Sequence, residues 1–350
     1  MNRHAPRRLS AKTVGLMLGT ATIVAIASPS TAIAGAPARL GVTTIASPTY
    51  SLVATIPGSA ESRHFAIDLD LDPLARKAYV STNGGVDVVS LRTNTFTKRL
   101  VEDSNYAPVA VDPLAHRAYV VTYPSVQAFN TLTDAPTKSY ETELVTAANV
   151  AVDSLARTLY WTYPESGLVA SLNLRTGVFG QTYPDGIYPQ QLATDSLRHR
   201  VFVANTYSRY SPDDGSHSLA VLDSRTGAVL KTVLLDSPPT TVAVDLALGK
   251  VFVATGATVT VLDAKTYKVI ATIASLGGNG ADVSAVDQIR HLAYLPNGYE
   301  PSVTVINTRT NKVVATIPTP SNARTVDVDP ITGRVYVIDD AGTLSVFAKR

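Results

Sequence analysis

Two aspartates stand where the other copies of a repeated pattern have alanine. A short pattern ending in Asp, such as Val-Ala-Val-Asp, occurs seven times, and the residue two before its Asp is Ala in five copies. In the first and seventh copies that residue is Asp70 or Asp327, and Asp68 lies two positions before Asp70. Carboxylates that converge can hold a cation or carry out general acid and base catalysis.

The same carboxylates can also be structural. A carboxylate in a crowded interior is costly unless it is hydrogen-bonded, paired or metal-bound. Three basic residues of the adjacent segments could be its partners, namely Arg63, His64 and Arg324. The group is therefore either a small polar or cation-binding site or a structural pairing between the first and last repeats, and we favour the pairing. We assign no metal site and no catalytic residue.

Tyrosines form the second candidate set. Eight of the 16 tyrosines fall in segments between the expected strands, where binding residues concentrate. Tyrosine is rigid and amphipathic, which suits contacts with a sugar, a peptide or a protein, although such residues can also simply cover apolar strand ends. The eight are Tyr106, Tyr123, Tyr163, Tyr183, Tyr188, Tyr207, Tyr210 and Tyr299.

One connection is longer than the others and lies in residues 205–217. It is polar, contains two of the tyrosines, and ends at His217. A loop of this kind suits a lid or a partner contact. Asp213, Asp214 and His217 could bind a cation, but their spacing matches no known loop signature, so we favour a solvated loop.

Other familiar chemistry is missing from the sequence. There is no cysteine, which excludes disulfides and thiolate chemistry, and there is no G-x-S-x-G, H-E-x-x-H or Walker motif. His116, His199 and His291 each follow a repeated Asp by four residues, so they are interpreted as turn residues rather than a metal triad. We expect no cofactor.

The spacing of the repeat predicts the fold. The final aspartates of the pattern are separated by 40, 41, 42, 50, 42 and 42 residues, and they are Asp72, Asp112, Asp153, Asp195, Asp245, Asp287 and Asp329. A period near 40 with several short strands per unit is typical of a β-propeller blade. We predict an all-β, seven-bladed propeller of four-stranded antiparallel blades.

Each repeat predicts the same blade. The inner strand ends at the repeated Asp, which caps the turn to strand two, and strand two carries an aromatic expected to pack between blades. These aromatics are Tyr79, Tyr119, Tyr160, Phe202, Phe252, Tyr294 and Tyr336. The seventh repeat has only three strands, and residues 51–56 resemble the fourth strands of repeats five and six. We therefore expect the N-terminal strand to complete the last blade and close the ring.

Such a blade places its connections on two faces. The turns between strands one and two and between strands three and four lie on one face, called the hairpin face below. The connections between strands two and three and between blades lie on the other, called the loop face. The hairpin turns are short and uniform, so we interpret them as scaffold and expect binding at the loop face.

The N-terminus predicts export. Basic residues precede an apolar stretch near residues 14–27, and Ala32-Ile33-Ala34 is typical of a cleavage site, so residues 1–34 are predicted to be a secretory signal peptide. Arg7-Arg8 also permits the twin-arginine route instead of Sec. Residues 35–48 are expected to form a flexible lead-in, and 49–350 a single propeller domain. We expect a secreted or extracytoplasmic monomer with no transmembrane segment after cleavage, and retention at the cell envelope is possible.

Charge argues against one class of partner. Of the 30 basic residues, 26 remain after residue 34, against 28 acidic residues. The basic excess therefore belongs to the predicted signal, and we expect no nucleic-acid binding.

The repeats resemble a known family. Val-Ala-Val-Asp, Val-Tyr-Val, Val-Thr-Val-Ile-Asn-Thr and Lys-Val-Val-Ala-Thr-Ile-Pro are similar to repeats of the YVTN family of β-propellers, which includes surface-layer-associated and periplasmic YncE-like proteins. The likeness covers about residues 50–348, but the signature itself is degraded at residues 79–82 and 119–122. The resemblance implies seven blades and an exported protein, and it implies little chemistry.

Our leading interpretation is a non-catalytic scaffold that binds a small molecule, a glycan or a protein through its loop face. The alternative is an exported lyase or hydrolase with a site at the axis mouth near Asp68, Asp70 and Asp327. A less favoured alternative, from resemblance alone, is a large subunit of an amine dehydrogenase.

Overall fold

The computed structural model describes most of the chain after residue 47. The described residues are 48–56, 66–82, 84–102, 107–142, 147–184, 188–206, 217–256, 258–274 and 284–350, and they form one compact unit. They contain strands and turns and no helix. No helix within these ranges could therefore cross a membrane.

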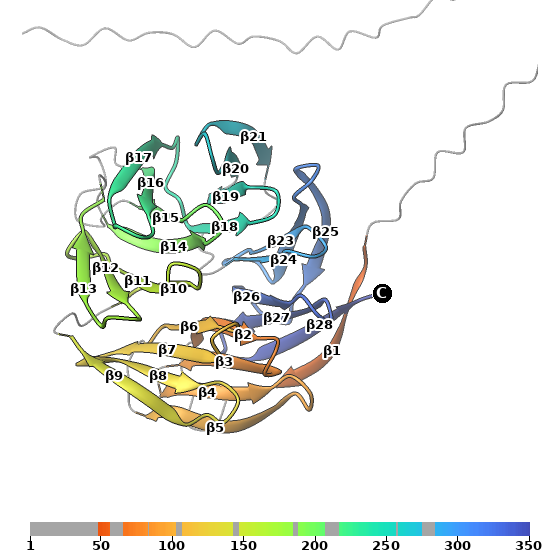
Figure 1. Ribbon diagram of the computed structural model, residues 1–350. Helices are drawn as coiled ribbons and strands as arrows, with labels where there is room; N and C mark the ends of the chain where they lie inside the picture. Colours follow the sequence, from red (N-terminus) through yellow and green to blue (C-terminus); the bar gives the residue numbers. More distant parts are fainter. Residues whose placement is uncertain are drawn as a thin grey trace, which may run out of the picture. The chain divides into compact units, whose positions relative to one another are not determined.

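The strands form seven antiparallel sheets of four, arranged as blades around an axis (Figure 1). Blades one to six take consecutive strands, from β2–β5 to β22–β25, and blade seven contains β26, β27, β28 and β1. This confirms the predicted fold. The inner strands are β2 (Ala66–Asp72), β6 (Val109–Asp112), β10 (Val150–Asp153), β14 (Pro189–Asp195), β18 (Thr241–Asp245), β22 (Ala285–Asp287) and β26 (Ala323–Asp329).

The other strands run outward from these in each blade. The second strands are β3 (Lys77–Thr82), β7 (Arg117–Thr122), β11 (Thr158–Tyr163), β15 (Arg200–Asn205), β19 (Lys250–Thr255), β23 (Leu292–Pro296) and β27 (Arg334–Asp339). The third strands are β4 (Gly85–Ser90), β8 (Ser125–Asn130), β12 (Leu168–Asn173), β16 (Ser218–Asp223), β20 (Thr258–Asp263), β24 (Ser302–Asn307) and β28 (Leu344–Lys349). The outer strands are β5 (Thr95–Glu102), β9 (Pro136–Glu141), β13 (Phe179–Thr182), β17 (Val229–Leu234), β21 (Val269–Ala274), β25 (Lys312–Pro318) and β1 (Tyr50–Ile56).

The aromatic of strand two packs against the next blade, as predicted. All seven aromatics are at most 3% exposed. Tyr79 of blade one packs with Val109 and Val111 of blade two, and Tyr336 of blade seven packs with Leu69 and Leu71 of blade one. Each clustered core therefore lies between two neighbouring blades, so burial on both faces explains the near-continuous apolar runs in the strands.

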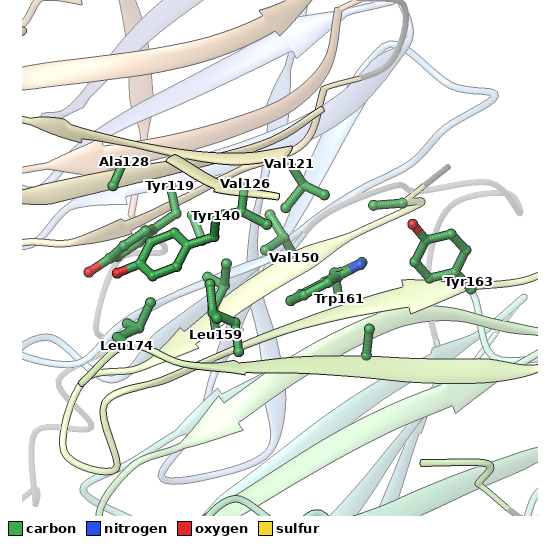
Figure 2. Close-up of a cluster of buried hydrophobic side chains, with 14 of the residues drawn as sticks. Tyr119, Val121, Val126, Ala128, Tyr140, Val150, Leu159, Trp161, Tyr163 and Leu174 are labelled. Atoms are coloured by element: carbon green, nitrogen blue, oxygen red, sulfur yellow. The ribbon is translucent and has the colours of Figure 1, made fainter. Parts of the chain in front are cut away.

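The core between blades two and three is the most aromatic (Figure 2). Tyr119 and Tyr140 of blade two lie beside Leu159 and Trp161 of blade three. The rings of Trp161 and Phe179 meet edge to face, with centroids 6.1 Å apart. Because Trp161 is fully buried, its large side chain contributes much of the apolar area at this boundary.

Blade seven joins the two ends of the described chain. β1 pairs antiparallel with β28, from Tyr50 opposite Lys349 to Ile56 opposite Leu344, and Figure 1 shows the two strands side by side. Ile56 is 5% exposed and belongs to the core between blades seven and one. The Tyr50 hydroxyl lies 3.1 Å from that of Tyr294 in blade six.

Candidate functional site

The inner strands surround a cavity of about 310 Å³ on the axis. All seven inner strands or the residues next to them contribute to its wall, so it is the central channel of the propeller. Besides small apolar residues, its wall contains carboxylates, amides and hydroxyls, which are Asp68, Asp70, Asp327, Asn149, Gln191, Gln288, Thr194, Thr241 and Ser284. The three candidate aspartates of the sequence therefore meet at one wall of the channel.

Each of these aspartates accepts hydrogen bonds from the neighbouring inner strand. Asp327 Oδ2 accepts from the Leu71 amide at 2.9 Å, across the boundary between blades seven and one. Asp70 Oδ2 accepts from the Val111 amide at 2.7 Å, and Asp68 Oδ2 from the Val109 amide at 3.0 Å, both across the boundary between blades one and two. The carboxylates thus join three consecutive inner strands.

The same arrangement occurs elsewhere around the channel with neutral side chains. The Leu192 amide donates to Asn149 Oδ1 at 3.1 Å, and the Leu246 amide donates to Gln288 Oε1 at 2.9 Å. Inner strands of adjacent blades do not form a ladder with one another, so their edge amides need other acceptors. Side chains of the inner strands, or of the residues directly beside them, supply these acceptors. This geometry supports the structural interpretation of the aspartates.

The three carboxylates nevertheless have unusual electrostatics. Burial raises the pKa of Asp70 well above its usual value, and the charge of Asp327 raises it further, whereas the hydrogen bond from Val111 acts in the opposite direction. Burial also raises the pKa of Asp327 to about 7, against the lowering effect of the bonds from Val328 and Leu71. The pair therefore retains a proton in mildly acidic solution.

The raised pKa values of these carboxyls predict how the stability of the fold depends on pH. A carboxyl whose folded pKa is raised stabilises the fold below its unfolded pKa of about 3.9, and this contribution is lost as pH rises through the folded pKa. We expect the free energy of unfolding to fall between about pH 4 and pH 7, by about 1–2 kcal/mol once solvent screening is allowed for. Asp327→Asn should flatten this slope in denaturant titrations.

The matched control for that titration is Asp236→Asn. Asp236 is an exposed acidic residue after β17, far in sequence from the cluster. Its removal should leave the slope as it is in the original protein. A slope that is the same in the Asp327→Asn protein and the original protein would contradict the proposed proton.

Only one of the three basic residues expected near the aspartates lies within the described residues. Arg63 and His64 lie outside the described residues. Arg324 is half-buried on β26, three positions before Asp327. Among the residues that the structure describes, no group of three or more His, Cys, Asp or Glu side chains is placed to hold a metal ion.

Seven of the eight candidate tyrosines fall into three groups. Tyr123, Tyr183 and Tyr299 are exposed, at 70%, 64% and 69%. They lie between β7 and β8, after β13, and between β23 and β24, which are all connections of the loop face. Tyr188 is half-buried just before β14, and Tyr106, Tyr207 and Tyr210 lie outside the described residues.

Tyr163 differs from its expected place. It is the last residue of β11 rather than a loop residue, and it is 5% exposed within the core between blades two and three (Figure 2). Strand two of blade three extends further than the sequence indicated, which draws this ring inward. His217, also a candidate, is half-buried immediately before β16, while the rest of the long connection, residues 207–216, lies outside the described residues.

Exposed acidic residues accompany the exposed tyrosines. In the described part of the chain, every acidic residue that is exposed belongs to the loop face, at the end of an outer strand or in a connection. They are Glu102, Glu141, Glu165, Asp236 and Glu300. The net charge of the sequence does not reveal this set, because it contains no information on how charge is distributed between the two faces.

The hairpin face contains a second carboxylate network. All seven repeated aspartates are fully buried, and the Oδ1 atom of each accepts a backbone amide two or three residues later, at 2.8–3.1 Å. This confirms their predicted role in the turns. The residue four positions after the Asp has a positive φ, between 52° and 70°, in all seven blades, which explains the position of the three histidines.

The second oxygen of these aspartates often binds the next blade. Asp245 Oδ2 accepts from His291 Nδ1 at 3.0 Å and from the Thr308 hydroxyl at 2.6 Å, both in blade six. Asp329 Oδ2 accepts from Arg76 at 2.6 Å, between blades seven and one. The network therefore ties adjacent blades together at the hairpin face.

Where the positive-φ residue is glycine, an arginine of the preceding blade takes the space. Arg198 binds Asp195 Oδ2 and the Leu246 carbonyl, both at 2.9 Å. A Cβ at Gly249 would lie 2.5 Å from Arg198 Nη2. The other five blades hold Arg or His at this positive-φ position, so it is the close approach of the guanidinium that favours glycine at Gly249.

Comparison with known proteins adds no family to this picture. A scan against protein-family models found no family that matches the chain, and a search of curated proteins found no match.

Proposed function

We propose that this chain is an exported, non-catalytic propeller of the YVTN type that binds a positively charged peptide or protein through its loop face. The observation that carries the proposal is the exposure of Tyr123, Tyr183 and Tyr299 on that one face. Large aromatic side chains that stay exposed in a folded protein are typical of contact surfaces, and tyrosine is enriched in them.

The charge of the loop face indicates the chemistry of the partner. The five exposed acidic residues lie on the same face as these tyrosines, so a cationic ligand is attracted to it and an anionic one is repelled. Tyrosine faces also attract ammonium and guanidinium groups. A lysine- or arginine-rich segment therefore fits this surface better than a neutral glycan or an anionic small molecule.

Export and family membership rest on the sequence. The basic and apolar residues of 1–34 support a signal peptide, and the repeated phrases support the YVTN type, together with the seven blades. The absence of helices in the described residues agrees with such a propeller. Backbone amides already donate hydrogen bonds to the three carboxylates of the inner strands. This supports a binding protein over an enzyme.

One observation favours a second candidate, an enzyme with its site in the channel. Asp70 and Asp327 line a cavity with raised pKa values, and such pairs occur at acid and base sites. Asp327→Asn distinguishes the two functions, because an enzyme would lose its activity whereas a loop-face binder would keep its affinity.

A thermal-shift assay tests the proposed function. We expect an oligolysine peptide to raise the unfolding temperature, while oligoglutamate and a neutral oligosaccharide leave it unchanged. A ligand at 100 times its dissociation constant should add about 2.7 kcal/mol. Replacing Tyr123, Tyr183 and Tyr299 together by Ser should remove most of the shift. Equal shifts with oligolysine and oligoglutamate, or no shift with either, would overturn the proposal.

A further inference from the structure

The hairpin face carries a ring of exposed aliphatic side chains. In six of the seven blades, the second residue after the repeated Asp is Leu or Ile at the tip of the turn, and it is 50–74% exposed. The fifth blade has Ala247 at this position. These apolar tips are Leu74, Leu114, Leu155, Leu197, Ile289 and Ile331. They follow the inner strands, so they lie around the axis of the ring (Figure 1).

Basic residues surround the apolar tips. Ten exposed Lys or Arg side chains lie in the hairpin turns or at the strand ends beside them, and we call them the hairpin bases. They are Arg92, Arg175, Arg225, Lys265, Lys268, Arg290, Arg309, Lys312, Lys349 and Arg350. Contacts between turns of different blades, such as that from Arg290 to the Pro330 carbonyl at 2.9 Å, show that these turns share one face.

The two faces therefore have opposite charge. The remaining exposed bases in the described ranges are Lys98, Lys138 and Lys231, which lie on outer strands, and all the exposed acids lie at the loop face. Acidic residues near the hairpin face are the buried turn aspartates and the half-buried Asp134, Asp223 and Asp263. Asp134 and Asp223 pair with basic residues, Lys77 and Arg200. The hairpin face is thus basic despite a nearly neutral chain.

We propose that the hairpin face docks on the surface of an anionic lipid bilayer. Such a surface attracts Lys and Arg side chains electrostatically, while exposed Leu and Ile side chains gain by entering the boundary between headgroups and acyl chains. A ring of aliphatic tips among basic residues supplies both contributions in one plane. In this orientation the acidic loop face points away from the bilayer.

Two other partners fit the surface less well. Single-stranded nucleic acids are bound by basic residues together with aromatic side chains that stack on bases, and the six tips are aliphatic. A second copy docked face to face would place two sets of hairpin bases against each other. A second copy docked head to tail satisfies the charges, but the described residues of the loop face offer exposed tyrosines and acids and no ring of aliphatic residues to receive the tips.

The absence of cysteine allows a labelling experiment with the full chain. Leu114→Cys places a single thiol at the most exposed tip, and Tyr299→Cys places the matched thiol on the loop face, with similar exposure. Each is labelled with a polarity-sensitive fluorophore and mixed with vesicles of phosphatidylcholine, with or without phosphatidylglycerol. We expect the fluorescence at position 114 to rise only with phosphatidylglycerol, and lipid-borne quenchers to reduce it. The label at position 299 should not respond.

A pair of charge variants tests the electrostatic part. Arg175→Gln with Arg309→Gln removes two hairpin bases for which the structure gives no side-chain hydrogen bond or ion pair. Gln181→Glu with Gln190→Glu makes the same change in net charge on exposed positions of β13 and β14. We expect the first pair to weaken partition into phosphatidylglycerol vesicles about tenfold and the second pair to have little effect.

Several outcomes would overturn the proposal. One is a label at position 114 that never enters the lipid, or that responds equally to vesicles without phosphatidylglycerol. Another is equal loss of partition in the two charge variants. A third is a concentration-dependent rise at position 114 without vesicles, because it would identify a second copy as the occupant of this face.

Discussion

Deleting residues 49–57 should destabilise the propeller severely. The deletion removes β1, and it exposes the whole edge of β28 to solvent. It also removes Ile56 from the core between blades seven and one, and the edge-to-face contact of Tyr50 with Tyr294, whose ring centroids are 6.2 Å apart. We expect a loss of about 3–5 kcal/mol in the free energy of unfolding, together with aggregation through the bare strand edge.

The controls for the deletion separate the strand from its neighbours in sequence. Removing residues 36–45, which precede β1, should leave the denaturant midpoint unchanged. Ile56→Ala alone should cost about 2–5 kcal/mol, because the side chain is almost completely buried. Unchanged denaturant titrations after deletion of 49–57 would show that β1 does not contribute to closing the ring.

Asp245→Ala should have the second large effect. This buried carboxylate accepts the Leu248 amide in its own turn, and His291 and Thr308 in the next blade. Alanine leaves these donors without an acceptor in a buried site, so we expect a loss of about 3–5 kcal/mol. Denaturant unfolding followed by tyrosine fluorescence measures the loss.

The matched control is Asp263→Ala in a turn between strands three and four. Asp263 accepts only from Lys265 and Thr266 of its own turn, and it is half-buried. Its loss should cost about 1 kcal/mol. A cost for Asp245→Ala no larger than that of Asp263→Ala would mean that the bonds between blades at the hairpin face add no stability.

Asp245 also has a pH dependence of the opposite sign to that of Asp327. Burial raises the pKa of Asp245, but the hydrogen bonds from Thr308, His291 and the Leu248 amide, together with the charge of His291, lower it further than burial raises it, so the pKa lies below its usual value. Its stabilisation is therefore present above about pH 4 and is lost as pH falls through the lowered pKa. With the loss at higher pH expected from Asp327, the protein should be most stable in mildly acidic solution.

The fold was predictable because the same blade pattern occurs seven times in the sequence. The spacing of the turn aspartates and the aromatic of strand two each gave seven independent indications of one blade. Even the position of β1 followed from the likeness of residues 51–56 to the fourth strands of other blades. Boundaries were less certain, as Tyr163 shows, because nothing in its local sequence separates the end of a strand from the start of a connection.

The candidate site was only partly predictable, because its properties depend on neighbouring blades. Asp70 and Asp327 were conspicuous as exceptions to the repeat, but the sequence does not reveal that amides of the next inner strand bind them. The exposed tips had a signal that was available, since Leu or Ile recurs at the second position after the turn Asp. From sequence alone, such a recurrent Leu or Ile is interpreted as a packing residue. Only the exposed fraction of the side chain, as at Leu114, shows that it is not buried.

We propose that the two faces of the ring have different roles and that the cationic ligand binds at the loop face. The most direct test is a fluorescence anisotropy titration of a labelled oligolysine peptide. It compares the original protein with two variants, Tyr123, Tyr183 and Tyr299 changed to Ser on the loop face, and Leu114, Leu197 and Ile331 changed to Ser on the hairpin face. We expect an affinity at least about tenfold weaker for the loop-face variant, and an unchanged affinity for the hairpin-face variant. Equal affinities in all three proteins, or a loss confined to the hairpin-face variant, would contradict it.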